Sequence, residues 1–268
     1  MIREKLIEKG VGFDKDFRMR GTGEVSRIEA LSDAVFGFAI TLLVVSLEVP
    51  QTFTELMQVM HGFAAFAISF VLLFVVWLTQ YKFFRRYGLN DNFTIWINAL
   101  LLFVVLFYVY PLKFLWNFLV DAIFGFSTNA HAPDGTPVSP ITQAQVPTLL
   151  TVFGIGYAAI FLIFALLYYH AYRKRTQLEL NELEIHDTWN NIVDNLLHVF
   201  VGLLSITISL ITGSGFGGMA YWLIGPVEFI NGMIMGKRRK IIEQRLEAEA
   251  SAAAPGDRSI SEGDTGRL

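Results

Sequence analysis

The chain contains no cysteine, so disulfides, cysteine-ligated metal sites and thiol catalysis are all excluded. Charge is scarce as well, because only 17% of the 268 residues are Asp, Glu, Lys or Arg, whereas 53% are hydrophobic. This balance is too apolar for an ordinary soluble domain and favours an integral membrane protein. The opening segment, MIREKLIEKGVGFDKDFRMRG, lacks an apolar core and a cleavage site, so we do not expect a signal peptide.

Enzyme signatures are also missing. No HExxH, GxSxG, Walker A or dinucleotide-binding glycine motif occurs in a suitable context, and the GSGFGG run is only a short loop between apolar segments. The five histidines show no metal-ligand spacing: His61, His131, His170, His186 and His198. We therefore expect no enzyme activity, no metal, no cofactor and no nucleic-acid partner.

Six apolar segments come close to the length of about 20 residues that a bilayer crossing needs. They lie at about 28–49, 56–80, 93–115, 147–170, 189–211 and 217–235. These segments are too apolar for the strands of a β-barrel, so the sequence predicts an all-α integral membrane protein with six transmembrane helices. The stretch at about 117–146 is rich in Pro, Ser and Thr and is expected to form an extracytoplasmic loop.

The basic residues indicate the orientation of these spans. Lys and Arg gather before the first span, between the second and third, between the fourth and fifth, and after the sixth. The other connections contain only Lys113, so the positive-inside rule places both termini in the cytoplasm. We expect a cytoplasmic arm at 1–26, a transmembrane domain at 27–236, and a cytoplasmic helix with a disordered tail at 237–268. The expected location is the cell (inner) membrane, crossed several times.

The first span carries ionisable residues near its start and an apolar stripe along one face. Arg27 and Glu29 either reach the lipid headgroups or face protein, whereas Asp33 lies deeper in the span. On a helical wheel one face collects Leu31, Ala34, Phe38, Thr41, Leu42, Val45 and Val49. Asp33 falls on roughly the opposite face. Such a stripe packs against lipid or another helix, or else copies of it surround a pore while Asp33 anchors the helix to its own subunit.

Polar side chains also lie within later spans. Asp194 and His198 share one face of the fifth span, which predicts either a satisfied polar pair inside the bundle or a proton relay. Glu228 in the sixth span is interpreted as an internal tether, with an ion ligand as the alternative. Asn98 in the third span is a candidate for a hydrogen bond between helices.

The segment RIEALSD resembles the RxxxFSD signature of the transmembrane protein 175 potassium channels, in their prokaryotic branch, through Arg27, Ser32 and Asp33. Trp77 in WLTQYKFF and Asn98 extend the likeness, which covers about 27–115. The resemblance implies a homotetramer in which the first helices line the pore and potassium ions pass a hydrophobic constriction. It also implies that the three matched residues belong to a network that holds the pore helix against its neighbours.

Counted from Asp33, the resemblance places the constriction at Phe38, Thr41, Leu42 and Val45. These positions agree with the apolar stripe that periodicity alone shows. Two positions depart from the family pattern. Leu31 replaces the phenylalanine before Ser-Asp, and Phe38 stands where isoleucine or leucine is usual.

We expect a potassium-permeable, homo-oligomeric cation channel in a lipid bilayer. The alternative is a secondary transporter or proton pathway that uses Asp33, Asp194, His198 and Glu228, and a third class is a non-conducting membrane scaffold. Flux separates the first two classes, because a channel passes current down a gradient. A transporter should instead lose its activity when Asp194 or His198 is neutralised.

Overall fold

Six long α-helices dominate the computed structural model, which describes residues 17–21, 25–45, 51–53, 56–57, 60, 62–124, 130–131, 137–138 and 141–253. The helices are α2 (Arg27–Val45), α4 (Phe63–Tyr87), α5 (Asn92–Phe124), α6 (Val146–Arg173), α7 (Glu182–Thr212) and α8 (Ile224–Ala253). The 3-10 helix η2 (Gly215–Leu223) joins α7 to α8, and η1 (Gln143–Gln145) precedes α6. Two short strands, β1 (Ala130–His131) and β2 (Pro137–Val138), pair antiparallel within the predicted loop.

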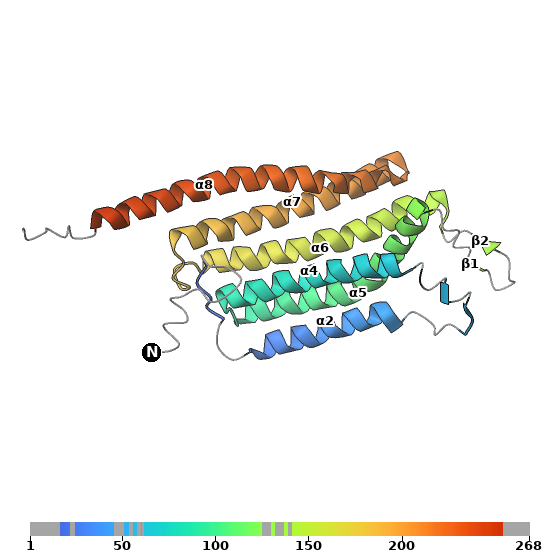
Figure 1. Cartoon of the computed structure of the whole chain (residues 1–268), viewed down its shortest axis with the longest axis horizontal. Helices are drawn as coiled ribbons and strands as arrows, with labels where there is room; N and C mark the ends of the chain where they lie inside the picture. The colour runs from blue at the N-terminus through green and yellow to red at the C-terminus, as the bar shows by residue number, and fades with distance from the viewer. Residues whose placement is uncertain are drawn as a thin grey trace, which may run out of the picture.

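The long helices lie side by side, with α2 at one edge of the bundle and α8 at the other (Figure 1). α2 packs on α4 and α5, α5 packs on α6, α6 on α7, and α7 on α8. Within the described residues, four helical segments are long and apolar enough to cross a membrane: Phe63–Tyr87, Asn92–Val120, Gln143–Arg173 and Glu182–Thr212. The prediction of an all-α membrane protein is confirmed.

The sixth predicted span differs in detail from the expectation. Its first part is η2, and α8 then continues without a break to Ala253, so the helix expected after 237 is the same helix. A 3-10 helix rises about 2.0 Å per residue and an α-helix about 1.5 Å, so Gly215 to Met235 covers about 36 Å. That length exceeds the bilayer core of about 30 Å. The third helix, α5, also continues through Pro111 to Phe124, past its predicted end.

One end of the bundle carries most of the arginines and is called the basic end here. It contains the start of α2, the ends of α4 and α6, and the start of α7, which side-chain contacts join to one another. The Tyr87 and Thr188 hydroxyls lie 2.7 Å apart, which ties α4 to α7. Asp91, in the turn after α4, accepts a hydrogen bond from Thr94 (2.6 Å) and bonds His170 of α6 (2.8 Å).

The Asp91 carboxylate also lies 3.2 Å from the Lys174 ammonium. Burial alone would raise the pKa of Asp91, but the bonds from Thr94, His170 and Lys174 outweigh it and lower that pKa to about 2. The turn between α4 and α5 is therefore fastened to the end of α6 by an ionised carboxylate.

Residues 17–21 do not behave as the water-facing arm that the sequence predicts for 1–26. Phe17 is only 2% exposed, and the Arg20 guanidinium pairs with Glu184 at the start of α7. A short segment with two arginines looks solvated in sequence because its partner lies 164 residues away along the chain. Residues 1–16 and 254–268 lie outside the described residues.

Small residues bring α6, α7 and η2 into close contact. A Cβ added at Gly154 of α6 would lie 2.7 Å from Ile206 Cγ1, and one added at Gly217 of η2 would overlap Ser209 Oγ and the Ser205 carbonyl oxygen. Close backbone approach is a main source of helix association in a bilayer, where hydrophobic burial between helices contributes little. These two glycines therefore set how tightly this half of the bundle packs.

We predict that Gly217→Ala lowers the thermal stability of the protein in detergent by about 1–3 kcal/mol, because the new methyl group overpacks the η2–α7 contact. Gly218→Ala is the matched control, since a Cβ there meets only Leu150, at 3.8 Å. Equal melting temperatures for the Gly217 variant and the parent would contradict this description of the contact.

Candidate functional site: the first helix and its polar supports

The start of α2 is fixed by a capping box. The Ser26 hydroxyl accepts a hydrogen bond from the Glu29 N–H (3.3 Å), and Glu29 Oε2 accepts hydrogen bonds from the Ser26 N–H and hydroxyl (2.9 Å each). Arg85 of α4 lies with its Nε 4.0 Å from the other Glu29 oxygen. The SRIE sequence thus begins the helix, and Arg85 links this first turn to α4.

A buried chain of hydrogen bonds joins α2 to α5 and α4. The Ser32 hydroxyl donates to the Ile28 carbonyl (2.7 Å) and accepts from Asn98 Nδ2 (2.9 Å). Asn98 Oδ1 in turn accepts from Gln80 Nε2 (2.9 Å). Ser32, Asn98 and Gln80 are 0%, 1% and 2% exposed, so each polar group depends on the next for its partner. We call these three residues the buried chain.

Two further contacts fasten α2 along its length. Trp77 Nε1 of α4 donates to Asp33 Oδ1 at 2.7 Å, and Lys113 Nζ of α5 donates to the Leu43 carbonyl at 2.8 Å. The lysine lies near the carbonyl end of α2, where the helix dipole favours a cation. Asp33 therefore contacts its own subunit, as the helical wheel suggested.

The structure brings together four of the predicted residues: Ser32, Asp33, Trp77 and Asn98. Sequence reasoning did not assign a role to Gln80 or Lys113. Gln80 carried a usable signal, since it is an amide inside an apolar span and lies one turn from Trp77.

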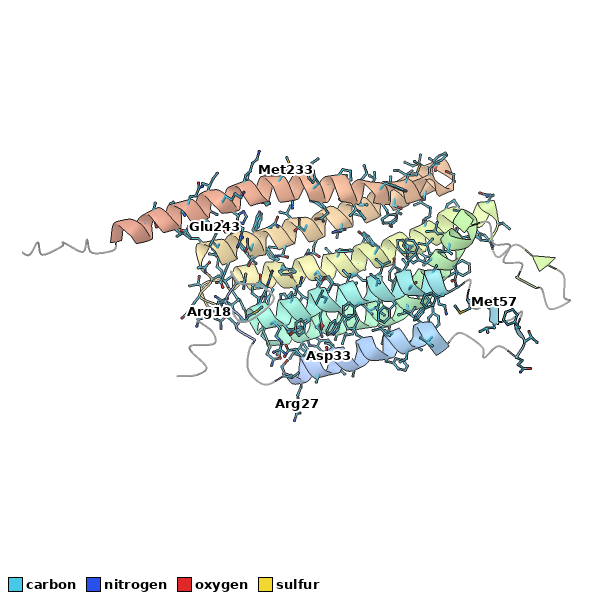
Figure 2. The ribbon with its side chains drawn as sticks, viewed as in Figure 1. Arg18, Arg27, Asp33, Met57, Met233 and Glu243 are labelled. Carbon is cyan, nitrogen blue, oxygen red and sulfur yellow. The ribbon has the colours of Figure 1, made fainter. Side chains whose placement is uncertain are left out.

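Arg27 is exposed and points away from the other helices (Figure 2). Among the described residues it has no hydrogen bond or ion pair, so it does not join Ser32 and Asp33 within one protomer. Its predicted place in the network that holds the pore helix stays a prediction.

The predicted stripe lies on the outside of the protomer. Phe38 is 58% exposed, Thr41 is exposed and Leu42 is half-buried, whereas the side chain of Val45 lies outside the described residues. The Thr41 hydroxyl donates to the Phe38 carbonyl (2.7 Å), which leaves the oxygen lone pairs on the exposed side. α2 thus exposes bulky apolar groups and one hydroxyl oxygen together.

The back of α2 packs into the bundle. Its buried side chains are Ile28, Ser32, Phe36, Ala39 and Leu43. The polar supports therefore hold this face inward, and the stripe faces outward as a consequence.

The polar residues of α7 and α8 form a separate group. His198 Nε2 lies 2.9 Å from Glu228 of α8, and His198 Nδ1 lies 2.5 Å from the hydroxyl of Tyr157 on α6. Asp194 accepts a hydrogen bond from Asn231 of α8. Asp194 and His198 share a face as predicted, and each has at least one partner on a neighbouring helix. Within the described part of the chain, no three His, Cys, Asp or Glu side chains are grouped so that they could hold a metal ion.

The fold and the supports of α2 define a multi-pass helical membrane protein. A family profile described as the endosomal/lysosomal potassium channel TMEM175 matches residues 27–108. A potassium channel from Marivirga tractuosa is 41% identical over 246 residues, which cover 90% of this chain and 99% of that protein. The chain therefore belongs to the TMEM175 family of potassium channels, as the RIEALSD segment predicted.

Two other comparisons agree with this assignment. A potassium channel from Chamaesiphon minutus is 34% identical over 105 residues, which cover 36% of this chain and 52% of that protein. A crystal structure of a variant of the potassium channel MtTMEM175, in complex with a nanobody–MBP fusion, matches with a TM-score of 0.73 and 41% identity. It covers 85% of this chain and all of that one, so the shared fold extends well beyond 27–115. The family is one of ion channels, which is not a class of enzymes.

We predict that Asn98→Ala and Gln80→Ala are energetically coupled by about 0.5–2 kcal/mol, because either change removes the same buried hydrogen bond. The measurement is a double-mutant cycle on reversible unfolding in mixed micelles. Gln80→Ala combined with Thr207→Ala is the control, since Thr207 is exposed on α7 and bonds only its own helix at the Leu203 carbonyl. Additive effects of the Asn98 and Gln80 changes would exclude the buried chain as a stabilising unit.

Proposed function

We propose that four copies of this potassium channel surround an axis, with α2 of each copy lining the pore and Phe38 forming the main constriction. The observation that supports this most directly is the exposure of Phe38 on a helix whose opposite face is buried in the bundle. The described residues leave more than half of this side chain uncovered, so a partner or lipid is expected to meet it in the membrane. The family match over the same helix favours the pore.

The distribution of side chains around α2 also supports a ring. One face of α2 is buried against α4 and α5. Because successive residues are rotated by about 100°, the centre of the stripe lies about 120° around the helix axis from the centre of this buried face. A third face carries Ala30, Gly37 and Val44, which are exposed and spaced seven residues apart. A helix in an inner ring needs one face for its own subunit, one for the axis and one for its neighbour.

The third face suits a neighbouring helix. A Cβ added at Gly37 would have no atom within 4 Å, so space lies beside this glycine. Small residues at such a face allow two helices to approach closely in a bilayer. The proposed homotetramer therefore places the α2 helices side by side, with Phe38 directed at the axis.

An apolar ring of this kind can control ion flow by excluding water. Potassium loses its hydration shell more readily than sodium, so a dry constriction favours potassium modestly. Phe38 adds aromatic rings, whose faces attract cations when they are turned toward the ion path. The Thr41 oxygen lies one turn further along α2 and can replace a water ligand of the ion.

The charge distribution supports a cell (inner) membrane protein with both termini in the cytoplasm. Arg85, Arg86 and Arg173 lie at the basic end, and the cluster at 237–240 follows the apolar part of α8. Such cations stay on the cytoplasmic side of a membrane. α2 itself is about 28 Å long, close to the thickness of the bilayer core.

The transporter alternative is less well supported. Asp194, His198 and Glu228 lie on α7 and α8, whereas Asp33 bonds Trp77 on the opposite side of the bundle (Figures 1 and 2). The four groups therefore do not form one substrate site in the protomer. The α7–α8 contacts act as a tether between helices.

We predict that Phe38→Ala raises the potassium flux into proteoliposomes about threefold or more, because a methyl group cannot close the constriction. Val44→Ala is the matched control, since Val44 is 48% exposed on the same helix but lies off the stripe. Equal flux from the parent and the Phe38 variant would exclude this residue from the constriction.

We predict that Thr41→Val lowers the potassium-to-sodium permeability ratio about twofold, because a methyl group replaces an oxygen that can coordinate the ion. The ratio is measured from reversal potentials under bi-ionic conditions. Thr79→Val on α4 removes a hydroxyl that likewise bonds its own helix, at Val75, and should leave the ratio unchanged. An unaltered ratio in the Thr41 variant would refute the coordinating role.

A further inference from the structure

The segment 17–21, called the strap here, is bound to the start of α7 through Arg20. Its guanidinium makes two parallel hydrogen bonds to the Glu184 carboxylate, Nη1 to Oε1 at 2.9 Å and Nη2 to Oε2 at 2.6 Å. It also donates to the carbonyl groups of Leu178 (2.6 Å) and Glu179 (2.9 Å) in the turn before α7. Bidentate hydrogen bonds between charged groups are markedly stronger than hydrogen bonds between neutral groups.

Glu184 is buried at this contact, and its Oε2 also accepts a hydrogen bond from the Asn181 N–H (3.0 Å) in the capping box of α7. Its side chain is 1% exposed, and its Oε1 also accepts from the Arg18 N–H at 2.8 Å. Loss of Arg20 would leave a buried carboxylate without its counter-charge, which is strongly unfavourable. The pair is therefore more than a surface ion pair of negligible effect.

The strap is also seated against the end of α4. The N–H groups of Arg20 and Gly21 donate to the carbonyls of Arg86 (3.3 Å) and Arg85 (3.0 Å). A Cβ at Gly21 would overlap the Phe84 carbonyl oxygen, so only glycine permits this approach.

Phe17 anchors the other end of the strap. Its ring meets the Tyr87 ring edge-on at 5.5 Å between centroids, and the Arg86 guanidinium lies 5.0 Å from its centroid. An aromatic contact and a cation over one ring each stabilise the arrangement.

Arg85 connects the strap to the first turn of α2. Its Nη1 donates to the Gly21 carbonyl at 2.8 Å, and its Nε lies 4.0 Å from the Glu29 carboxylate that closes the capping box. The chain itself provides a second connection, because only residues 22–25 separate Gly21 from Ser26 and each spans at most about 3.6 Å. A continuous set of contacts thus runs from Glu184 through Arg20, the strap and Arg85 to the start of α2.

This route matters because α2 packs on α4 and α5, whereas α7 packs on α6, η2 and α8. The strap contacts both the start of α7 and the end of α4 beside the start of α2, in addition to the direct Tyr87–Thr188 contact between α4 and α7. We propose that Arg20 and Glu184 are positioning residues, which set the position of α2 relative to the α6–α7 half and thereby the open probability of the channel. This inference rests on the proposed pore role of α2.

The expected effect concerns the position of α2 and leaves permeation itself unchanged. Phe38 lies 11 residues beyond Arg27, about 16 Å along the helix, so the strap does not touch the ion path. Release of the strap should therefore change how often the pore is open while unitary conductance and ion selectivity stay as in the parent.

The test is single-channel recording of the full-length protein in planar bilayers, at one voltage and one pH. Arg20→Gln and Glu184→Gln should each change the open probability about threefold or more, in the same direction, and the double variant should not exceed the larger single effect. The charge-swapped variant Arg20→Glu with Glu184→Arg should return the value toward that of the parent. Glu182→Gln is the matched control, since Glu182 is exposed on the same helix turn and pairs with Arg245 of α8.

Folding is checked separately, because Glu184 is buried. Phe17→Ala weakens the strap at its other end and leaves both charged groups of the ion pair in place, so it should shift the open probability in the same direction as Glu184→Gln. Trypsin cleavage at Arg18 or Arg20 should become faster in both variants. Intact oligomers of these variants with unchanged open probability would overturn the strap proposal alone, as would altered selectivity. A parent protein that passes no potassium current would overturn the proposed function as well.

Discussion

The orientation of α2 depends on one buried chain of hydrogen bonds, from Ser32 through Asn98 to Gln80. In the apolar interior of a membrane protein an unpaired amide or hydroxyl is strongly unfavourable, so these three groups stay together. Successive residues of an α-helix are rotated by about 100° around its axis. Holding Ser32 in place therefore also fixes the direction in which every other side chain of α2 faces. This constraint turns Phe38 outward. Without these polar groups, the rotation of α2 would depend on its remaining contacts and on the apolar packing of Phe36, Ala39 and Leu43.

The two halves of the bundle are held by different forces. α6, α7 and η2 pack through glycine and small side chains, which allow close contact along the whole interface. α2 is instead fastened at separate points: the capping box with Arg85, the buried chain, the Asp33–Trp77 bond and the Lys113 contact. The back of α2 also buries Phe36, Ala39 and Leu43 against α4 and α5. The structure thus combines a tightly packed part with a helix that is located by polar bonds.

Much of this arrangement could be predicted from the sequence. Hydrophobic length predicted the helices, periodicity predicted the stripe with Phe38, and the RIEALSD segment indicated the family. The polar contact at Asn98 followed from an amide in an apolar span, but Gln80 was missed because it stands beside charged and aromatic residues. The strap could not be predicted, since Arg20 looks solvated until Glu184 is known to lie beside it. The 3-10 geometry of η2 was not predicted either, and neither was the close approach of Gly217 to α7.

The absence of cysteine allows one direct test of the central claim, that the stripe of α2 lines the ion path. Phe38→Cys, Thr41→Cys and Val44→Cys would be made one at a time. Each variant would be treated with a charged, water-soluble thiol reagent while the potassium current is recorded. The proposed pore predicts that modification at Phe38 and Thr41 blocks the current and that potassium ions slow the reaction, whereas modification at Val44 has little effect. Unreactive cysteines at both stripe positions in a conducting channel would contradict the claim.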